Sequence, residues 1–446
     1  MALSTPRILR QGLYLGWAFS AFLMINAILS VREDRQALQT IGKDAAPSVI
    51  AAEHIKSALS DMDANAANEL LSAPGRASQA VKTAYEDRRK EASKALIAAA
   101  ENITFGAAER VPIEQIQLAL GEYEIRVQQA RDYHEAGDPR RDAAYLAATA
   151  KMDDVLWPAA DALDKANLDV LQDTYRTRRS LASISLVALI FIGVALMSIL
   201  LAIQVFVFRR TNRVLNLPLV GCTLICLAFL MHAVGILGAS MRHLKVAKED
   251  AFTSMHALWR ARAVAYRASA DESRFLLLHS GGGVFERDFD AQIDSLAKVP
   301  DGQSYEQTAN RAVAGKKAND FTGYLADELK NITFEGEGEA AKATLIALRD
   351  YVARDGQLRA LEHAGKHQDA IAQALGGRSG QSHWAFEEFD RGLTKTLAIN
   401  QKAFDEAVEE GFRALYGFEI TALVAGVALC GLLWLGIRPR LREYQL

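Results

Sequence analysis

The chain has 446 residues, half of them apolar, and a formal net charge of −3. Two long segments are acidic: residues 32–179 hold 20 basic and 25 acidic side chains, and residues 239–415 hold 23 and 27. Binding of nucleic acid needs a concentrated basic surface, so this charge distribution excludes nucleic acid as a partner of either segment. The three cysteines lie in apolar runs, so we expect no disulfide and no cluster of metal ligands.

Four apolar segments are each long enough to cross a membrane as a helix, and they cover residues 12–31, 181–208, 214–241 and 416–437. A hydrocarbon core about 30 Å thick needs roughly 20 helical residues. A cleaved signal peptide is the alternative for the first segment. Its length and the lack of a clear cleavage site favour an uncleaved anchor.

Arginines beside these segments predict the orientation of the chain. They stand in the connection 209–213 and in the tail 438–446, at Arg209, Arg210, Arg213, Arg438, Arg440 and Arg442. Basic residues next to a span stay on the cytoplasmic side. We therefore predict a multi-pass protein of the plasma membrane with residues 1–11, 209–213 and 438–446 in the cytoplasm. Both large segments, 32–180 and 242–415, are then extracytoplasmic. The arginines serve topology first, with contacts to anionic lipid or to a cytoplasmic partner as the alternative.

The first external segment reads as four helices. Ile55, Leu59, Met62, Ala66 and Leu70 form one apolar stripe with helical spacing within a first helix over 32–71. Further helices are expected over 76–101 and 112–136, and a fourth runs from about residue 140 into the second span. Four helices with short turns predict an antiparallel bundle.

The second external segment repeats this pattern. Asn102 to Phe105 reads Asn-Ile-Thr-Phe, as does Asn331 to Phe334, and Tyr123 and Arg131 match residues 228 positions later. Asn65 to Leu71 falls on Asp271 to Leu277 at an offset of 206, so about 22 extra residues are expected near 281–283 and 298–307. Because repeats define architectures, we predict a duplication. The expected fold is all-α, with four membrane helices and two extracytoplasmic four-helix bundles in tandem.

No signature of catalysis is present. The metalloprotease, phosphate-loop, nucleophile-elbow and dinucleotide-binding motifs are all missing from the sequence. We therefore expect no enzymatic activity, no cofactor and no bound metal.

Two polar stripes are candidates for binding a ligand or a partner. Asp61, Asn65 and Asn68 lie beside the apolar stripe of the first helix. The corresponding helix of the second half carries Arg260, Arg267, Asp271 and Arg274 next to Trp259. Arginines beside aromatic rings hold carboxylates with two parallel hydrogen bonds. The alternative is a solvated face with ion pairs among Arg267, Asp271 and Arg274.

Residues 40–47 and 61–71, together with 256–262 and 271–274, resemble the GlnX-type membrane proteins of actinobacteria. The resemblance implies four spans and two external helical bundles. It also implies a relay in which a solute-binding lipoprotein senses dicarboxylic amino acids outside and a serine/threonine kinase responds inside. No catalytic residue of that family has a counterpart to assign.

The sequence therefore favours a non-catalytic signal relay that acts on a separate cytoplasmic effector, since only a short tail is predicted inside. Two alternatives remain. In the first, the protein senses a small molecule directly through the arginine face of the second bundle. In the second, it is a scaffold of the cell envelope.

Overall fold

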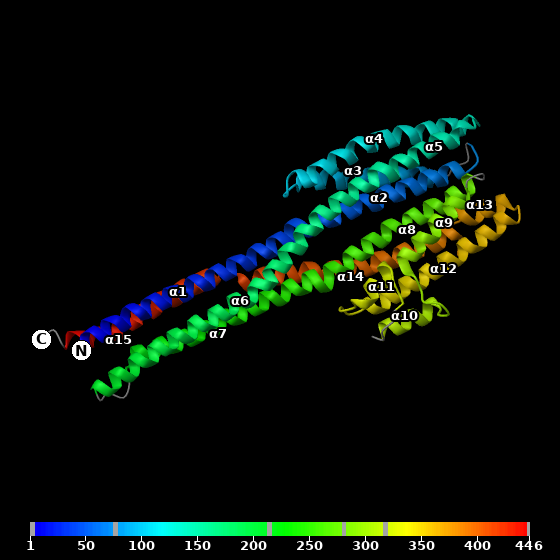
Figure 1. Ribbon diagram of the computed structural model, residues 1–446. Coiled ribbons are helices and arrows are strands. Elements are labelled where there is room, and N and C mark those ends of the chain that lie inside the picture. Colours follow the sequence, from blue (N-terminus) through cyan, green and yellow to red (C-terminus); the bar gives the residue numbers. More distant parts are fainter. Residues whose placement is uncertain (1–4, 75–78, 212–215, 279–281, 315–319, 444–446) are drawn as a thin grey trace. The chain divides into compact units, whose positions relative to one another are not determined.

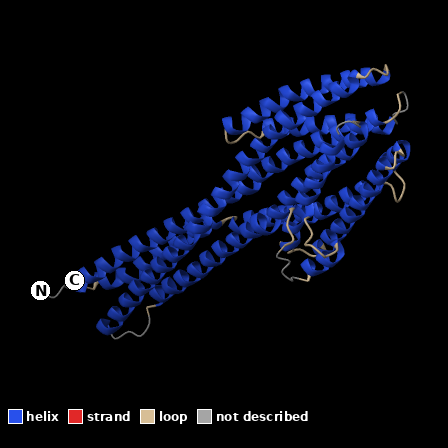
Figure 2. Cartoon of the chain, turned by 45° about the vertical axis from the view of Figure 1, so that its right-hand side comes forward, coloured by secondary structure: helices blue, strands red, loops and turns tan. Residues whose placement is uncertain are grey.

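The computed structural model describes residues 5–74, 79–211, 216–278, 282–314 and 320–443, and these are helical almost throughout (Figures 1 and 2). The described residues contain no strand, and a single pair of backbone hydrogen bonds links Lys298 to Thr322. The predicted all-α class is confirmed. The chain divides into two compact units. The apolar unit comprises residues 1–41, 172–245 and 406–446, and the polar unit comprises residues 42–171 and 246–405.

The apolar unit contains α1 (Thr5–Gln39), the second part of α6 (Trp157–Thr211), α7 (Leu217–Lys245) and α15 (Phe418–Arg442). Among the described residues, four helices are long and apolar enough to cross a membrane. Glycines let them approach closely, as small residues do between membrane helices. A Cβ atom on Gly16 of α1 would clash with the Leu433 side chain, and one on Gly436 would lie 2.8 Å from the Leu219 side chain. These helices are consistent with the predicted multi-pass membrane protein, and the orientation of the chain stays a prediction.

A buried ion pair joins α1 to α6 in this unit. Arg178 donates to Asp34 Oδ1 at 2.5 Å and to Glu33 Oε2 at 2.7 Å, and the side chains of Arg178 and Asp34 are 5% and 1% exposed. Arg35 of α1 donates to Glu419 of α15 at 2.6 Å. These contacts fix three helices of the unit to one another.

The first half of the polar unit is built from helices. It contains α2 (Ala46–Leu71), α3 (Gln79–Glu101), α4 (Ala107–Glu135), α5 (Arg140–Lys151), the π-helical segment η2 (Met152–Leu156) and the start of α6. Helix α4 begins five residues before the predicted start and contains Pro112. The turn before it is held by Glu109, whose carboxylate accepts from the backbone N–H groups of Thr104 and Phe105 at 2.7 and 2.6 Å.

The second half departs from a four-helix plan. It contains α8 (Thr253–Leu277), α9 (Gly282–Ala297), α10 (Tyr305–Val313), α11 (Tyr324–Lys330), α12 (Glu337–His363), α13 (His367–Leu375) and α14 (Ser382–Leu415). Three helices, α9 to α11, stand where one was predicted, and α10 with its connections accounts for much of the extra length. Gly281, part of the expected linker, lies outside the described residues.

Helices α2 and α8 pack against each other at the centre of the polar unit. Twenty of the 26 residues of α2 and 17 of the 25 residues of α8 are buried. A helix buried on most sides is normally apolar all round, yet both carry buried charges. Alanine and serine at many positions allow the two backbones to approach. The two halves of the polar unit thus share one interior.

Each of these central helices is preceded by a π-helical segment, η1 (Thr40–Ala45) before α2 and η3 (Val246–Phe252) before α8. The Asn102 amide donates to Ser48 Oγ at 2.8 Å and to the Asp44 carbonyl at 3.4 Å. Asn331 makes the same contacts, to Ser254 Oγ at 3.0 Å and to the Asp250 carbonyl at 2.8 Å. The repeated Asn-Ile-Thr-Phe sequence therefore positions an amide that binds a π-helical carbonyl in both halves.

The connection into the fourth span differs from the prediction of a continuous helix. Helix α14 ends at Leu415, and Gly417 takes a left-handed conformation (φ 74°) before α15 begins. A residue with a Cβ atom adopts this conformation only at a cost, so glycine suits this turn.

We expect Arg178→Ala to destabilise the apolar unit by about 3–5 kcal/mol, because Asp34 is left as a buried unpaired charge. Thermal unfolding of the purified protein in detergent measures the effect. Arg176→Ala is the matched control, since Arg176 lies on the same helix with its side chain 74% exposed. Equal unfolding temperatures for the two variants would contradict the importance of the buried pair.

Asn331→Ala should loosen η3, because the carbonyls of Glu249 and Asp250 lose their amide donor, and a hydrogen bond of this kind contributes about 0.5–1.5 kcal/mol. Hydrogen–deuterium exchange of peptides covering residues 246–252 should become faster. Thr333→Ala, in the same turn, removes only an exposed hydroxyl that donates to the Asn331 carbonyl, and it should leave exchange unchanged. Unchanged exchange in Asn331→Ala would show that this amide does not hold the segment.

Candidate functional site

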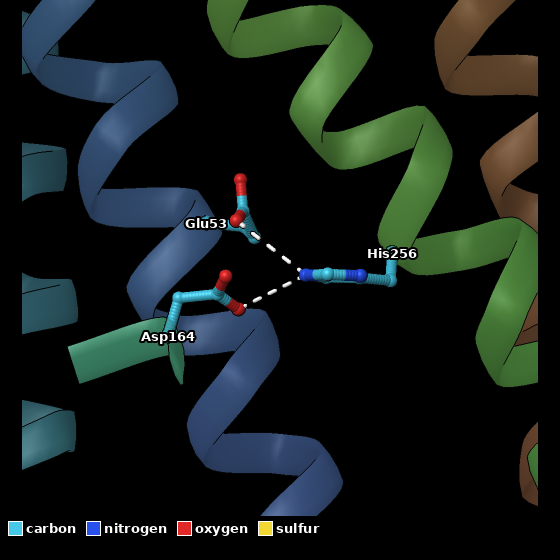
Figure 3. Close-up of side chains that lie close together, drawn as sticks. All are labelled: Glu53, Asp164 and His256. Atoms are coloured by element: carbon cyan, nitrogen blue, oxygen red, sulfur yellow. Dashed lines mark hydrogen bonds and ion pairs between the residues drawn. The ribbon is translucent and has the colours of Figure 1, made fainter. Parts of the chain in front are cut away.

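Charged side chains from both halves meet along the interface of α2 and α8. Figure 3 shows the first group, in which the His256 ring of α8 points between Glu53 of α2 and Asp164 of α6. His256 Nε2 lies 3.0 Å from Asp164 Oδ1 and 3.8 Å from Glu53 Oε1. Lys56 donates to Glu53 at 2.7 Å and to Asp161 at 2.7 Å. Glu53 and Lys56 are almost completely buried.

The ionisation of this group follows from burial and pairing. Burial raises the pKa of Glu53, against the opposing effect of Lys56. Burial acts to lower the pKa of Lys56, but Glu53 and Asp161 together raise it above its usual value. Burial likewise acts to raise the pKa of Asp164, and the hydrogen bond and charge of His256 outweigh it, so that this pKa is lowered. The group therefore holds a charged lysine in the interior.

Glu53, Asp164 and His256 also present three ligand atoms within 4.8 Å of one another. Carboxylate and imidazole ligands of this kind suit a divalent cation. The Lys56 ammonium, however, lies 2.7 Å from the Glu53 oxygen, where it supplies positive charge and repels a second cation. We assign no metal to this group.

A second buried group centres on Arg274 of α8. Its guanidinium donates to Asp63 of α2 and, at 2.6 Å, to Asp271 Oδ1. The side chains of Arg274 and Asp63 are both 4% exposed. Tyr123 donates to the other oxygen of Asp63 at 2.9 Å, and Gln292 donates to Asp271 Oδ2 at 2.8 Å. This network crosses from one half of the polar unit to the other.

A cavity of about 560 Å³ lies between the halves and brings together the first predicted stripe, Asp61, Asn65 and Asn68. Its other walls come from α3, α8, α13 and α14. Asp61 is buried and pairs with Arg88 of α3, and it also accepts from the Asn65 amide at 2.7 Å. Burial, with the charge of Asp390 adding to it, raises the pKa of Asp61 to about 6.

The predicted arginine stripe lies elsewhere and is engaged within the fold. Arg267 donates to Asp153 at 2.9 Å and stacks over Trp157, and Arg260 stacks over Tyr324. The Trp259 ring lies 3.9 Å from that of His54. Of the ion pairs weighed as the alternative, Arg274–Asp271 is present, whereas Arg267 pairs with the other half instead. Ligand binding by this stripe stays a prediction.

Five of the six arginines assigned to topology are described by the structure, and they lie near the ends of the apolar helices. Arg209 and Arg210 end α6, and Arg213 lies outside the described residues. Arg440 pairs with Glu443 at 2.5 Å, and Arg438 stacks over Trp434. Arg442 is the last residue of α15.

Sequence reasoning missed most of the second-half wall of the cavity. Asp390 of α14 accepts two hydrogen bonds from Arg262, at 2.6 and 3.0 Å, and one from Tyr266 at 3.1 Å. Phe386 packs against Tyr266 with ring centroids 5.0 Å apart. Tyr266 stood beside the predicted arginine stripe, but no local pattern marks the face of α14 that lines the cavity.

The fold and its buried charges define an all-helical protein with several potential membrane spans and one polar unit that contains a cavity. Residues 37–176 match the family model described as the actinobacterial sensor domain. The first half of the polar unit is therefore similar to a sensor domain, and the match includes Asp61, Asn65, Asn68 and Arg88. Neither the curated proteins nor the solved structures gave a match to the chain.

Two other buried carboxyl groups should make stability depend on pH. Burial, aided by the charge of Asp355, raises the pKa of Glu272 to about 8, and burial raises that of Glu328 to about 8. These pKa values exceed the unfolded value of 4.5, so the folded protein binds more protons than the unfolded one between pH 4.5 and pH 8. Stability therefore falls as pH rises through that range and levels off above pH 8. We expect an unfolding temperature several degrees lower at pH 9 than at pH 6.

Glu272→Gln combined with Glu328→Gln should flatten this dependence, since glutamine cannot lose a proton. Glu306→Gln, at a side chain 60% exposed, is the matched control and should retain it. Thermal unfolding followed from pH 6 to pH 9 provides the measurement. The same slope in the double variant and the control would show that these carboxyl groups do not titrate in this range.

Proposed function

We propose that the protein is a non-catalytic transmembrane sensor that passes an extracytoplasmic signal to a separate cytoplasmic effector. The observation that carries this proposal is the match of residues 37–176 to a sensor domain, because that segment forms one wall of the cavity and continues along α6 into an apolar helix. The resemblance to GlnX-type proteins suggests the finer assignment. In that assignment the signal is amino-acid availability reported by a solute-binding lipoprotein, and the effector is a serine/threonine kinase.

The π-helical segments offer a physical route for the signal. In an α-helix each residue turns the chain by about 100°, so a change between π and α hydrogen bonding would rotate the residues on one side of the segment relative to the other. π-Helical turns often mark functional sites in helices. The Asn102 and Asn331 amides hold η1 and η3 in their present form. A ligand or partner that prefers one arrangement by about 1.4 kcal/mol shifts the populations tenfold.

Direct sensing of a small molecule is a second candidate, and the cavity beside Asp61 favours it over a scaffold role. This site differs from the one predicted from the sequence, which used only the arginine face of the second half. The cavity is lined by residues from both halves. The duplication of a span–bundle–span unit remains our interpretation of the matching Asn102 and Asn331 contacts.

Deleting the gene that encodes this protein in its host should abolish the change in serine/threonine phosphorylation that follows addition of dicarboxylic amino acids. The wild-type chain and the variant Thr104→Ala/Thr333→Ala should restore it. Asn102→Ala/Asn331→Ala should not, because the π-helical segments lose their donors. Quantitative phosphoproteomics measures the response, with protein abundance in the membrane as a control.

An unchanged phosphorylation response after deletion would contradict the relay. Crosslinking in intact cells identifies the captured proteins and tests the lipoprotein and the kinase separately. Protease added to spheroplasts should cleave within residues 32–180 and 242–415, and resistance of both segments would contradict their predicted location.

A further inference from the structure

The cavity between the halves has an excess of negative charge. Five carboxylates line it or pair with residues that do, Asp61, Glu91, Glu387, Glu388 and Asp390, against three arginines, Arg88, Arg262 and Arg391. Arg88 is shared between Asp61 and Glu91, and Arg262 is bound by Asp390. The contact of Glu387 is with His383 at 3.4 Å, and no arginine pairs with it among the described residues.

Hydrogen-bond acceptors also remain open along the wall. The Asn65 amide nitrogen donates to Asp61, both to the carboxylate at 2.7 Å and to the backbone carbonyl at 2.8 Å. No donor to the Asn65 side-chain carbonyl is found among the described residues. A carboxylate has about four acceptor positions, so Asp61 can accept further hydrogen bonds beyond those from Arg88 and Asn65.

The remaining lining is apolar or aromatic. Val81, Ala84 and Leu375 supply aliphatic surface, and Phe386 and Tyr266 supply rings. Aromatic faces attract organic cations within about 6 Å of the ring centroid. The volume falls within the range of roughly 300–1,000 Å³ that is usual for sites of small molecules.

We propose that this cavity binds a small organic cation whose primary ammonium group is held by Asp61 and Glu387 and whose apolar part lies against Phe386. A dicarboxylate fits poorly, because it adds negative charge where carboxylates already outnumber arginines. A divalent metal fits poorly as well, because Arg88 adjoins Asp61 and much of the wall offers no ligand atom. The binding itself is inferred from the cavity alone. Its role as a signal rests on the proposed sensor function.

Calorimetry and thermal unfolding of the purified full-length protein in detergent test the inference, with putrescine as the probe. Putrescine should bind saturably and raise the unfolding temperature by a few degrees. Its neutral counterpart 1,4-butanediol, the dianion succinate and magnesium chloride at matched ionic strength should not. A larger shift with succinate, or the same shift with magnesium chloride, would overturn the assignment.

Asp61→Asn should weaken putrescine binding about tenfold or more, because a charge-assisted hydrogen bond is lost. Asp87→Asn on α3 is the matched control, because Asp87 does not line the cavity and its side chain is 62% exposed. Ala84→Trp fills the cavity without changing a charge and should abolish binding even if Asp61→Asn alters folding. Equal affinity in the wild type and in both cavity variants would overturn the proposal.

The two proposals fail separately. Putrescine binding without any change in cellular phosphorylation would leave the cavity assignment intact and count against the relay. A phosphorylation response to amino acids in a protein that binds no amine would support the relay and overturn the cation site.

Discussion

Charges buried between α2 and α8 are the constraint on which the polar unit depends. Arg274 pairs with Asp63 of the other half as well as with Asp271 of its own half, and His256 meets Asp164 of the other half. Separating the halves without hydrating these groups would leave buried charges unpaired, at about 3–5 kcal/mol for each broken pair. Partial separation of the two halves of the polar unit is therefore disfavoured, because it would break these ion pairs while the charges are still buried.

The matching contacts of Asn102 and Asn331 place the same device at the start of both central helices. Their surroundings nevertheless differ, since one half has α3 where the other has α9, α10 and α11. The similarity to a sensor domain covers residues 37–176 of the first half. The second half has the same amide contact to its π-helical segment, although its covering helices differ. The contact to the central helix is thus the feature common to both halves.

Hydropathy predicted the all-α class and the spans, because both depend on local sequence. Asp61, Asn65 and Asn68 were recognised because polar residues beside an apolar stripe are unusual, and they line the cavity. The arginines of α8 could not be interpreted from their spacing, since binding a ligand and pairing with Asp63 or Asp153 leave the same pattern. No local pattern identified Asp390 and Phe386, because the cavity brings α14 and α2 residues together from more than 300 positions apart in the sequence.

The cavity takes Asp61 and Arg88 from one half and Phe386 and Asp390 from the other. Neither half contains all the lining residues of this cavity, so a fragment with one half alone would lack part of the binding site. An occupant in contact with both walls would stabilise the association of the two halves for as long as it is bound. A movement that separated the two walls of the cavity would in turn release the occupant. Ligand release and mechanical displacement of the helices would then be coupled.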